Sequence, residues 1–308
     1  MKRQTGKSRS SGFAPRHRLG QNFILDDSLM ATVAEASLAG PEDSVLEIGP
    51  GMGTLTRQLA DRAGNVLAIE VDETLRPYLT VALENRKNAE VIFGDVLRFD
   101  LGKLCREHFG QGPLRVAANI PYYITTEILL KVMRELPDAR SLAFMVQREV
   151  ADKLLAGPGE DGYGPLTILA QMHYELERAL EVPADCFTPR PRVDSTFVVF
   201  RRRPLYELRN EAFFDKMLHR IFLMRRKTLL NNLISQYGLD RAAAAEVLAA
   251  VGVPEQVRAE ALDLAQLARL SEVLYDCAGK KNITGPDSDS VSDAGRERAP
   301  ANDTCEEE

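Results

Sequence analysis

The sequence predicts an α/β fold in which a seven-stranded, doubly wound sheet with an antiparallel edge strand precedes a small all-α domain. Between residues 44 and 200, short apolar and β-branched runs alternate with amphipathic stretches, which is typical of a parallel sheet covered by helices on both faces. Beyond Pro204 no β-rich run occurs, and apolar residues recur at helical spacing. A chain of 308 residues has room for one main domain and a smaller second one.

Seven runs of the sequence predict the strands. Five are separated by helical stretches, are expected to be parallel, and comprise residues 44–48, 66–71, 90–93, 114–118 and 141–146. Two later runs lie on either side of a proline-rich loop and are expected to form an antiparallel pair at the sheet edge, over residues 174–182 and 195–201. The helical spacing of the second domain is clearest in Phe213, Phe214, Met217, Leu218, Ile221 and Phe222.

Composition divides the chain into four segments. We expect a basic, flexible arm over residues 1–17, a main domain over 18–204, a helical domain over 205–278 and a disordered acidic tail over 279–308. The tail is expected to be disordered because it holds almost nothing to bury. The first residues also have the composition of a transit peptide, but a motif described below begins at residue 18, which favours a short arm.

The net charge of -6 would argue against a nucleic-acid partner, but the charge is unevenly distributed. Residues 281–308 hold three basic residues and eight acids, so the rest of the chain is close to neutral. Residues 1–20 carry six basic side chains and no acid, and residues 201–227 carry nine against three acids. Both segments are candidate phosphate-contacting surfaces, although solvated charge is the alternative. The candidate RNA contacts are Arg16, Arg18, Arg225, Arg226 and Lys227.

Cysteine usage and hydropathy exclude several classes of protein. Four cysteines are scattered without CxxC pairs or a cluster of histidines, so the sequence predicts neither a metal site nor a disulfide framework. No apolar run is long enough to cross a bilayer, so no membrane partner is expected. We therefore expect a protein of the reducing cytoplasm.

A glycine-rich turn joins the first predicted strand to a helix. Residues 45–56 read VLEIGPGMGTLT, and glycines such as Gly49 and Gly51 let the backbone approach a ligand closely. A dinucleotide site is the competing interpretation, but its fingerprint requires Gly or Ala at the sixth position, where this chain has Thr54. That departure weakens the dinucleotide interpretation without excluding it, and a simple strand-to-helix turn is the remaining alternative.

Two acids follow at the ends of the next two predicted strands. Glu70 lies where a carboxylate accepts hydrogen bonds from the hydroxyls of a ribose, although a surface acid is the alternative. Asp95 can accept from an adenine amino group, with Val96 against the ring. Because the carboxyl ends of parallel strands share one edge of a sheet, these positions indicate an adenosine moiety without phosphates. S-adenosylmethionine is the commonest cofactor of this kind.

The fourth predicted strand ends in Asn119-Ile120-Pro121-Tyr122. An aromatic amine is a poor nucleophile, and acceptors aimed at its hydrogens stabilise the positive charge that develops when it is methylated. The side-chain oxygen of Asn119 and the carbonyl preceding or at Pro121 are candidate acceptors, and Tyr122 offers a face for stacking an extruded base. Proline fixes the turn, so the carbonyl is preorganised. The alternative is that this motif only breaks a strand.

Five ordered segments resemble the ribosomal RNA adenine dimethyltransferase family over nearly the whole chain, and its bacterial small-subunit branch most of all. They are residues 18–24 (RLGQNFI), 47–54, 119–125, 187–195 (FTPRPRVDS) and 225–229 (RRKTL). The resemblance implies a Rossmann-like class I methyltransferase fold and S-adenosylmethionine-dependent dimethylation of the N6 amines of two adjacent adenines in the 3′-terminal hairpin of 16S rRNA. It also implies a monomer without a metal that acts on the immature 30S subunit, with a catalytic first domain and an rRNA-recognition helical domain.

The resemblance implies roles for single residues of the cofactor site. Asn22 and the backbone at Ile24 would help to close over S-adenosylmethionine, and Gly49 would approach its methionine part. Glu70 would take the ribose and Asp95 the adenine. Position 24 is more often Leu in the family, but a main-chain contact would survive Ile24.

Two single residues and one basic cluster remain to be compared with the family. Asn119 would lie between cofactor and target, and Phe187 resembles the aromatic residue that covers the other face of the flipped adenine. Phe187 can instead serve only as an anchor for its loop. The basic cluster at residues 225–227 lies on a predicted helix whose neighbours Phe222, Leu223 and Leu229 face a core. Its charges can reach rRNA phosphates or pair internally with acids.

Other functions share part of this pattern. The antibiotic-resistance branch acts on large-subunit rRNA with the same catalytic motifs, but residues 225–229 and the long helical domain favour the small-subunit branch. A DNA adenine methyltransferase shares the Asn-x-Pro-Tyr chemistry, but the sequence holds no obvious target-recognition domain. A non-catalytic assembly factor would not require the intact set of Gly49, Glu70, Asp95, Asn119 and Tyr122.

Overall fold

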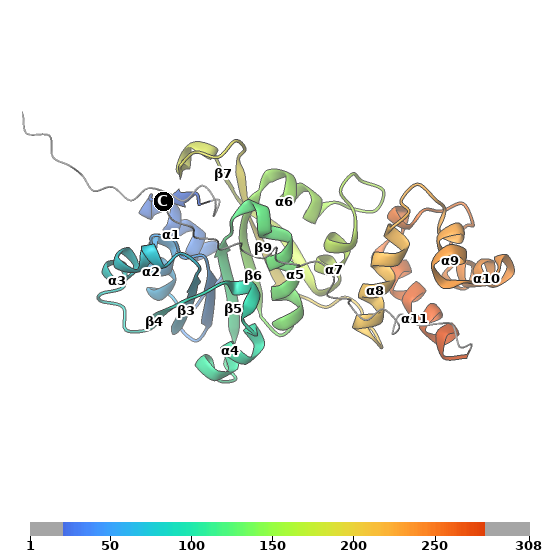
Figure 1. The fold of residues 1–308 in the computed structure, drawn as a ribbon, viewed down its shortest axis with the longest axis horizontal. Helices are drawn as coiled ribbons and strands as arrows, with labels where there is room; N and C mark the ends of the chain where they lie inside the picture. Colours follow the sequence, from blue (N-terminus) through green and yellow to red (C-terminus); the bar gives the residue numbers. More distant parts are fainter. Residues whose placement is uncertain (1–20, 281–308) are drawn as a thin grey trace, which may run out of the picture. The chain divides into compact units, whose positions relative to one another are not determined.

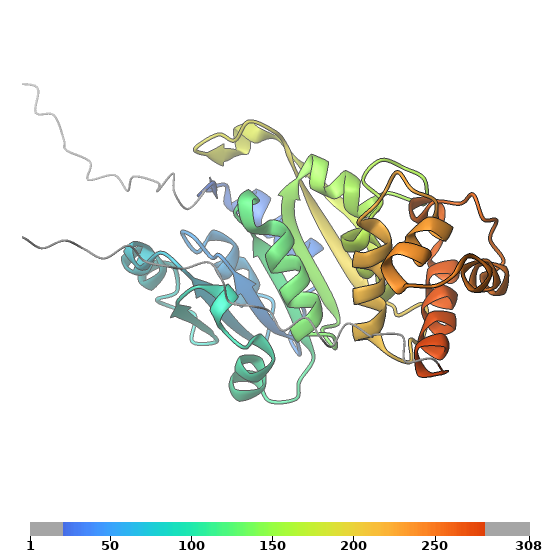
Figure 2. The same cartoon turned by 45° about the vertical axis from the view of Figure 1, so that its right-hand side comes forward.

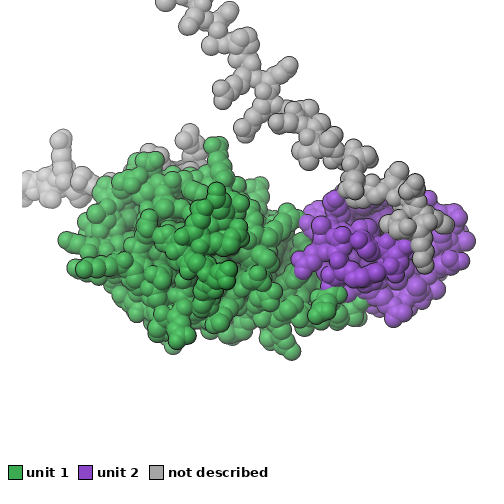
Figure 3. Space-filling model, turned by 90° about the horizontal axis from the view of Figure 1, so that it is seen from below, with its two compact units in different colours: residues 1–207, 260–265 green, residues 208–259, 266–308 purple. Residues whose placement is uncertain are grey.

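The computed structural model describes residues 21–280. Most of the predicted arm and tail, with Arg16 and Arg18, lies outside the described residues. The chain divides into two compact units, one of residues 1–207 with 260–265 and the other of residues 208–259 with 266–308 (Figure 3).

A seven-stranded sheet forms the centre of the first unit, in the order β4-β3-β2-β5-β6-β9-β7 (Figure 1). The strands are β2 (Ser44–Ile48), β3 (Asn65–Glu70), β4 (Ala89–Phe93), β5 (Leu114–Asn119), β6 (Ser141–Gln147), β7 (Tyr174–Val182) and β9 (Ser195–Arg202). Strands β2 to β6 are parallel, while β9 is antiparallel to both β6 and β7. The predicted sheet is confirmed, and the reversed strand is β9, one position in from the edge.

Helices cover both faces of this sheet (Figures 1 and 2). One face packs against α4 (Leu101–Phe109), α5 (Thr125–Glu135), α6 (Arg148–Leu155) and α7 (Pro165–His173). The other face packs against α1 (Asp27–Ala36) and α2 (Thr54–Ala60), and α3 (Arg76–Ala82) buries Leu79 beside Phe23. Because both faces are covered, the inner strands are almost continuously apolar, as the sequence pattern predicts.

Short elements join these layers. Strands β1 (Phe23–Ile24) and β8 (Phe187–Thr188) pair antiparallel and place two distant motifs side by side. The 3-10 turns are η2 (Glu73–Leu75), η3 (Val96–Arg98), η4 (Tyr122–Ile124), η5 (Ala184–Cys186) and η6 (Ala259–Ala261). From β2 the chain proceeds outward through β3 and β4, whereas β5 and β6 lie on the other side of β2. The loops after β2 and β5 therefore diverge, and open α/β sheets bind ligands in the crevice that this divergence leaves.

The second unit contains α8 (Glu211–Phe222), α9 (Leu229–Tyr237), α10 (Arg241–Val251) and most of α11 (Leu264–Lys280). Polar side chains begin three of these helices by accepting from backbone N–H groups in the first turn: Asn210 for α8, Thr228 for α9 and Asp240 for α10. The predicted apolar stripe is confirmed as the buried face of α8, which comprises Phe214, Met217, Leu218, Ile221 and Phe222.

The basic cluster does not lie on a helix, contrary to the prediction. Helix α8 ends at Phe222, and residues 223–227 form a turn before α9. Thr228 caps α9 in an extended conformation, so a continuous helix is interrupted there. Leu223 is 70% exposed and does not face a core, whereas Phe222 and Leu229 are buried as expected. We call residues 225–227 the basic turn.

Two further features concern residues 21–280 only. None of the helices in this range combines the length and the apolarity that a bilayer span requires. In the same range no three side chains of His, Cys, Asp or Glu are grouped so that they could hold a metal ion.

Candidate active site

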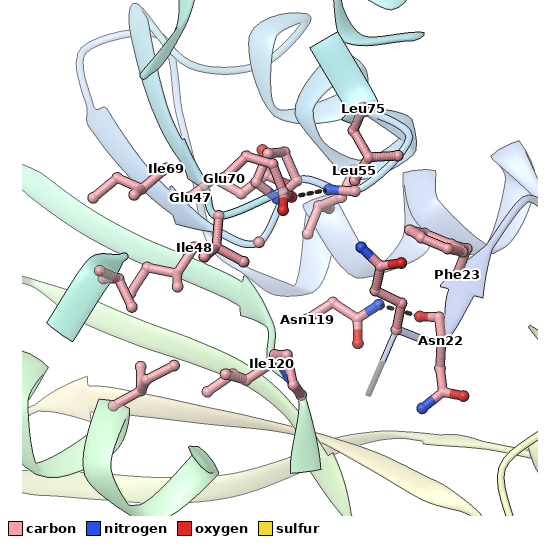
Figure 4. A pocket seen from close by; sticks show the side chains of 18 of the residues that line it. Asn22, Phe23, Glu47, Ile48, Leu55, Ile69, Glu70, Leu75, Asn119 and Ile120 are labelled. Atoms are coloured by element: carbon pink, nitrogen blue, oxygen red, sulfur yellow. Dashed lines mark hydrogen bonds between the residues drawn. The ribbon is translucent and has the colours of Figure 1, made fainter. Parts of the chain in front are cut away.

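A cavity of about 340 Å³ opens where β2, β3 and β5 end, next to the loop after β4 (Figure 4). This volume is in the range of small-molecule sites. The cavity brings together residues that the sequence predicted separately, and its lining includes Asn22, Ile24, Gly49, Gly51, Glu70, Asp95, Asn119, Pro121 and Tyr122.

The glycine-rich turn lies against the cavity in a conformation that favours glycine. Gly49 and Gly51 have φ angles of 75° and 58°. A Cβ at Gly49 would lie 3.3 Å from the carbonyl oxygen of Asn119, and one at Gly51 would lie 3.0 Å from the ring of Phe23. The turn therefore brings its backbone directly to the cavity wall.

The segment before α1 is tied to the cavity from several sides. Gln21 Nε2 donates to Asp72 Oδ2 at 2.8 Å, and Thr54 Oγ1 donates to the carbonyl of Ile24 at 2.8 Å. Thr54 is the residue that departs from the dinucleotide fingerprint, and its hydroxyl anchors β1 to the start of α2. Residues 21–24 thus form a fixed wall of the cavity.

Glu70 ends β3 as a buried acid with a 4% exposed side chain. Its Oε2 accepts from the N–H of Gly51 at 3.1 Å, and its Oε1 accepts from the N–H of Asp72 at 2.8 Å. Burial raises the pKa of Glu70, and these backbone hydrogen bonds oppose that rise. The two backbone donors fix the carboxylate beside the glycine turn, where its remaining lone pairs can accept from hydroxyl groups.

Asp95 follows β4 and is held less tightly than Glu70. Its side chain accepts from the N–H of Leu97 at 3.0 Å, which caps η3. The carboxylate lies 3.6 Å from the guanidinium of Arg98, and the side chain of Asp95 is 41% exposed. Asp95 therefore forms the solvent-facing rim of the cavity.

Asn119 closes the end of β5. Its Nδ2 donates to the carbonyl of Asn22 at 3.4 Å (Figure 4), which leaves the side-chain oxygen as an acceptor. Pro121 is the cap residue before η4, and its carbonyl already accepts from the N–H of Ile124 at 3.2 Å and from the hydroxyl of Thr125 at 3.4 Å. Of the two candidate carbonyls, that preceding Pro121 is therefore the better acceptor.

Tyr122 is half-buried, and a hydrogen bond holds the hydroxyl end of its ring. The hydroxyl lies 2.7 Å from Oγ of Ser195, a buried residue of β9. Burial raises the pKa of Tyr122, so the phenol stays protonated at neutral pH. The next residue, Tyr123, also lines the cavity and is 62% exposed.

Phe187 is buried and does not line the cavity. Its ring is 3% exposed, packs in a core cluster with Ile24 and Phe197, and does not line the cavity. Pairing of β8 with β1 directs this side chain inward, and burial of a large aromatic side chain stabilises that position by about 2 kcal/mol. This position is compatible with the alternative that Phe187 anchors its loop, and its role toward the flipped adenine stays a prediction.

Glu47 is a lining residue that the sequence analysis did not single out. It is 1% exposed in the middle of β2, and burial raises the pKa of its carboxyl group to about 8. The sequence does contain a signal for Glu47, because it is an acid within the otherwise apolar run VLEI.

The basic turn belongs to the second unit and does not line the cavity. Arg225, Arg226 and Lys227 are all exposed. Asn232 is buried, and its Nδ2 donates to the carbonyl of Ile221 at 3.1 Å, which holds the end of α8 beside α9. The turn between these helices is therefore held at its base.

Two solved structures with a similar fold are methyltransferases that, by their names, act on adenine or on rRNA. A dimethyladenosine transferase from Plasmodium falciparum is 25% identical with a TM-score of 0.70, over 83% of this chain and 98% of that one. The 23S rRNA methyltransferase ErmE is 29% identical with a TM-score of 0.63, over 82% and 99%. The fold and the cavity thus define a class I methyltransferase, and its methyl donor is S-adenosylmethionine.

The family model described as ribosomal RNA adenine dimethylase matches residues 12–276, and the chain belongs to this family. A relative from Listeria innocua, named ribosomal RNA small subunit methyltransferase A, is 40% identical over 88% of this chain and 94% of its own length. A relative of the same name from Shouchella clausii is 41% identical over 87% and 93%. The predicted family and the predicted cofactor are confirmed.

Proposed function

We propose that this protein dimethylates the N6 amines of two adjacent adenines in the 3′-terminal hairpin of 16S rRNA within the immature 30S subunit. The observation that carries the proposal is that one cavity is lined both by Glu70, a buried acid placed to bind a ribose, and by Asn119, whose side-chain oxygen can accept a hydrogen bond. The names of the relatives at 40% and 41% identity support the small-subunit substrate.

The residues of the cavity fit the cofactor. Glu70 is held by two backbone donors and accepts from the ribose hydroxyls, while Asp95 at the rim accepts from the adenine amino group. The turn at Gly49 has no side chain and brings its backbone to the cavity, and Asn22 with Ile24 forms the opposite wall. S-adenosylmethionine, when bound, supplies an electrophilic methyl group.

The target amine is activated by acceptors rather than by a base. The side-chain oxygen of Asn119 and the carbonyl of Ile120 accept from the two amine hydrogens, which localises the lone pair on nitrogen and stabilises the positive charge that develops. Tyr122 stacks on the extruded adenine, and its bond to Ser195 keeps the ring in place. The amine sheds its proton after methyl transfer, so no general base is needed.

The remaining parts of the chain bind the ribosomal particle. The helical domain, residues 205–278, recognises rRNA, and the exposed basic turn contacts its phosphates. The basic arm with Arg16 and Arg18 adds further phosphate contacts. The enzyme acts as a monomer in the cytoplasm and requires no metal.

Large-subunit rRNA is the alternative substrate, because ErmE has a similar fold. Incubation with radiolabelled S-adenosylmethionine and either 30S precursor particles or protein-free 23S rRNA separates the two. We expect label in the 30S particles. Label confined to 23S rRNA would establish the alternative, label confined to DNA would indicate a DNA methyltransferase, and particle binding without label would indicate an assembly factor.

A further inference from the structure

The basic turn lies in a part of the second unit that carries positive charge only. Residues 216–239 hold five lysines and arginines and no acid. Arg226 and Lys227 are exposed, and neither side chain forms an ion pair with another residue of the described part of the chain. Arg241 of the same unit differs, because it pairs with Glu255 at 2.7 Å. Two cations of the basic turn are therefore available to an anionic partner.

Residues 281–308, which we call the acidic segment, carry the opposite charge. Eight acids and three basic residues give this segment a net charge of -5. Two stretches of it, residues 282–295 and 299–308, hold three and four acids and no basic residue. The family model matches residues 12–276, so the acidic segment lies outside the region that the model describes. The proposed methyl transfer therefore gives this segment no task.

The acidic segment is long enough to reach the basic turn. It follows Lys280 at the end of α11, and the acidic segment and the basic turn both belong to the second unit. A compact unit of fewer than about 100 residues has a radius of gyration of about 11–13 Å. A chain as long as the acidic segment can span up to about 90 Å when it is extended. Every point on the surface of the second unit is therefore within its reach.

We propose that the acidic segment binds the basic turn and competes with rRNA phosphates for its cations. A single exposed ion pair is weak, but several carboxylates meet several cations here, and the tether gives an effective concentration of about 1 mM. Carboxylates on the basic turn exclude weakly bound RNA, whereas a ribosomal particle that also contacts other parts of the enzyme displaces them. This inference rests on the proposed function, because it requires the basic turn to contact rRNA.

Binding of a short single-stranded RNA to the full chain tests this competition. In the neutral-segment variant, all eight acids of the acidic segment are replaced by Asn or Gln. In the matched control, each Asp of the segment is replaced by Glu and each Glu by Asp, which keeps the charge. At about 0.1 M salt we expect the neutral-segment variant to bind this RNA about three- to tenfold more tightly than wild type, and the control to bind like wild type. The difference should shrink as salt rises, because salt screens exposed charges.

The same comparison in a chain whose Arg225, Arg226 and Lys227 are replaced by Gln locates the contact. If the acidic segment acts on the basic turn, its neutralisation should leave the RNA affinity of this chain unchanged, because the two changes are coupled. An equal gain with and without the basic turn would show that the segment only repels RNA, and no gain in either chain would show that it does not compete. Either result would overturn the proposal.

Carbodiimide cross-linking of the dilute full chain without RNA, followed by mass spectrometry, detects the contact itself. We expect links from Lys227 to carboxylates of the acidic segment, and we expect added RNA to suppress them. Lys87, an exposed lysine of the first unit, is the control. No link to Lys227, or an equal yield at Lys87, would overturn the proposal and leave the proposed function intact. If wild type neither binds nor methylates rRNA, the proposed function fails, while the links at Lys227 still decide whether the contact exists.

Discussion

The cavity of the first unit and the basic turn of the second hold their polar groups in different ways. In the cavity, Glu70 accepts from two backbone N–H groups and Asn119 donates to the carbonyl of Asn22, so each side chain has a defined position. The three side chains of the basic turn are exposed. Catalysis requires acceptors that are fixed before the substrate arrives, whereas phosphate contacts need only exposed cations. Changes in the cavity should therefore affect transfer or cofactor affinity, and changes in the turn should affect rRNA affinity.

The largest effect is expected from Asn119→Ala. Loss of an acceptor that faces the target amine should lower kcat for methyl transfer about 10²–10³-fold, while binding to 30S particles persists. Asn65→Ala, at the opposite end of the sheet, serves as the matched control and should leave kcat unchanged. Turnover of Asn119→Ala within a few fold of wild type would remove the catalytic assignment.

Glu70→Gln should weaken cofactor binding about 10- to 100-fold, because hydrogen bonds to a charged, buried acceptor are worth about 1.5–3 kcal/mol. Asp95→Asn should have a smaller effect, because the side chain of Asp95 is 41% exposed and solvent competes for its bonds. Calorimetric titration with S-adenosylmethionine measures both variants. Equal losses would show that burial does not distinguish the two acids.

The stability of the ligand-free protein should depend on pH through Glu47. Its pKa is raised in the folded state to about 8 from the usual 4.5, so below pH 8 the folded chain holds a proton that the unfolded chain releases. The free energy of unfolding of wild type, relative to Glu47→Gln, should fall by about 1.4 kcal/mol per pH unit between these values and level off above. Urea unfolding at a series of pH values measures this difference, and parallel profiles would contradict it.

Replacement of Arg225, Arg226 and Lys227 by Gln should weaken rRNA binding about tenfold and reduce the slope of log K against log salt by about two to three, because each phosphate contact contributes about 0.7–0.9. Cofactor affinity should not change. Arg241→Gln is the control, since Arg241 lies in the same unit and pairs with Glu255 at 2.7 Å. An unchanged salt slope would indicate that the basic turn does not meet phosphates.

The smallest effect is expected from Ser195→Ala. Loss of the 2.7 Å hydrogen bond to the Tyr122 hydroxyl should raise the free energy of the transition state by about 1 kcal/mol, which lowers kcat/KM about fivefold. Tyr122→Phe should cost about the same, and the double variant should cost no more than either change alone. Additive losses would show that the hydroxyl pair does not act as a unit.

The sheet was predictable from the sequence because each buried strand is an apolar run that ends at a recognisable polar residue. The same runs place Gly49, Glu70, Asp95 and Asn119 at one edge, since parallel strands align their carboxyl ends. The pairing of β1 with β8 was not predictable, because two-residue strands more than 160 residues apart leave no periodic pattern. That pairing buries Phe187, to which the family resemblance assigns a contact with the flipped adenine.

The basic turn and Glu47 were misread or missed for other physical reasons. In the sequence, residues 225–227 continue the helical pattern of α8, but the helix ends at Phe222 and a new one begins after the cap residue Thr228, which the sequence pattern alone does not reveal. Glu47 lies within the glycine-turn motif, but its burial is a property of the assembled sheet.

The most direct test of the central claim is mass spectrometry of 16S rRNA from 30S precursor particles incubated with this protein and methyl-labelled S-adenosylmethionine. We predict labelled N6,N6-dimethyladenosine at two adjacent positions of the 3′-terminal hairpin with wild type, and its absence with Asn119→Ala. No labelled dimethyladenosine with wild type, or equal labelling by both proteins, would contradict the account.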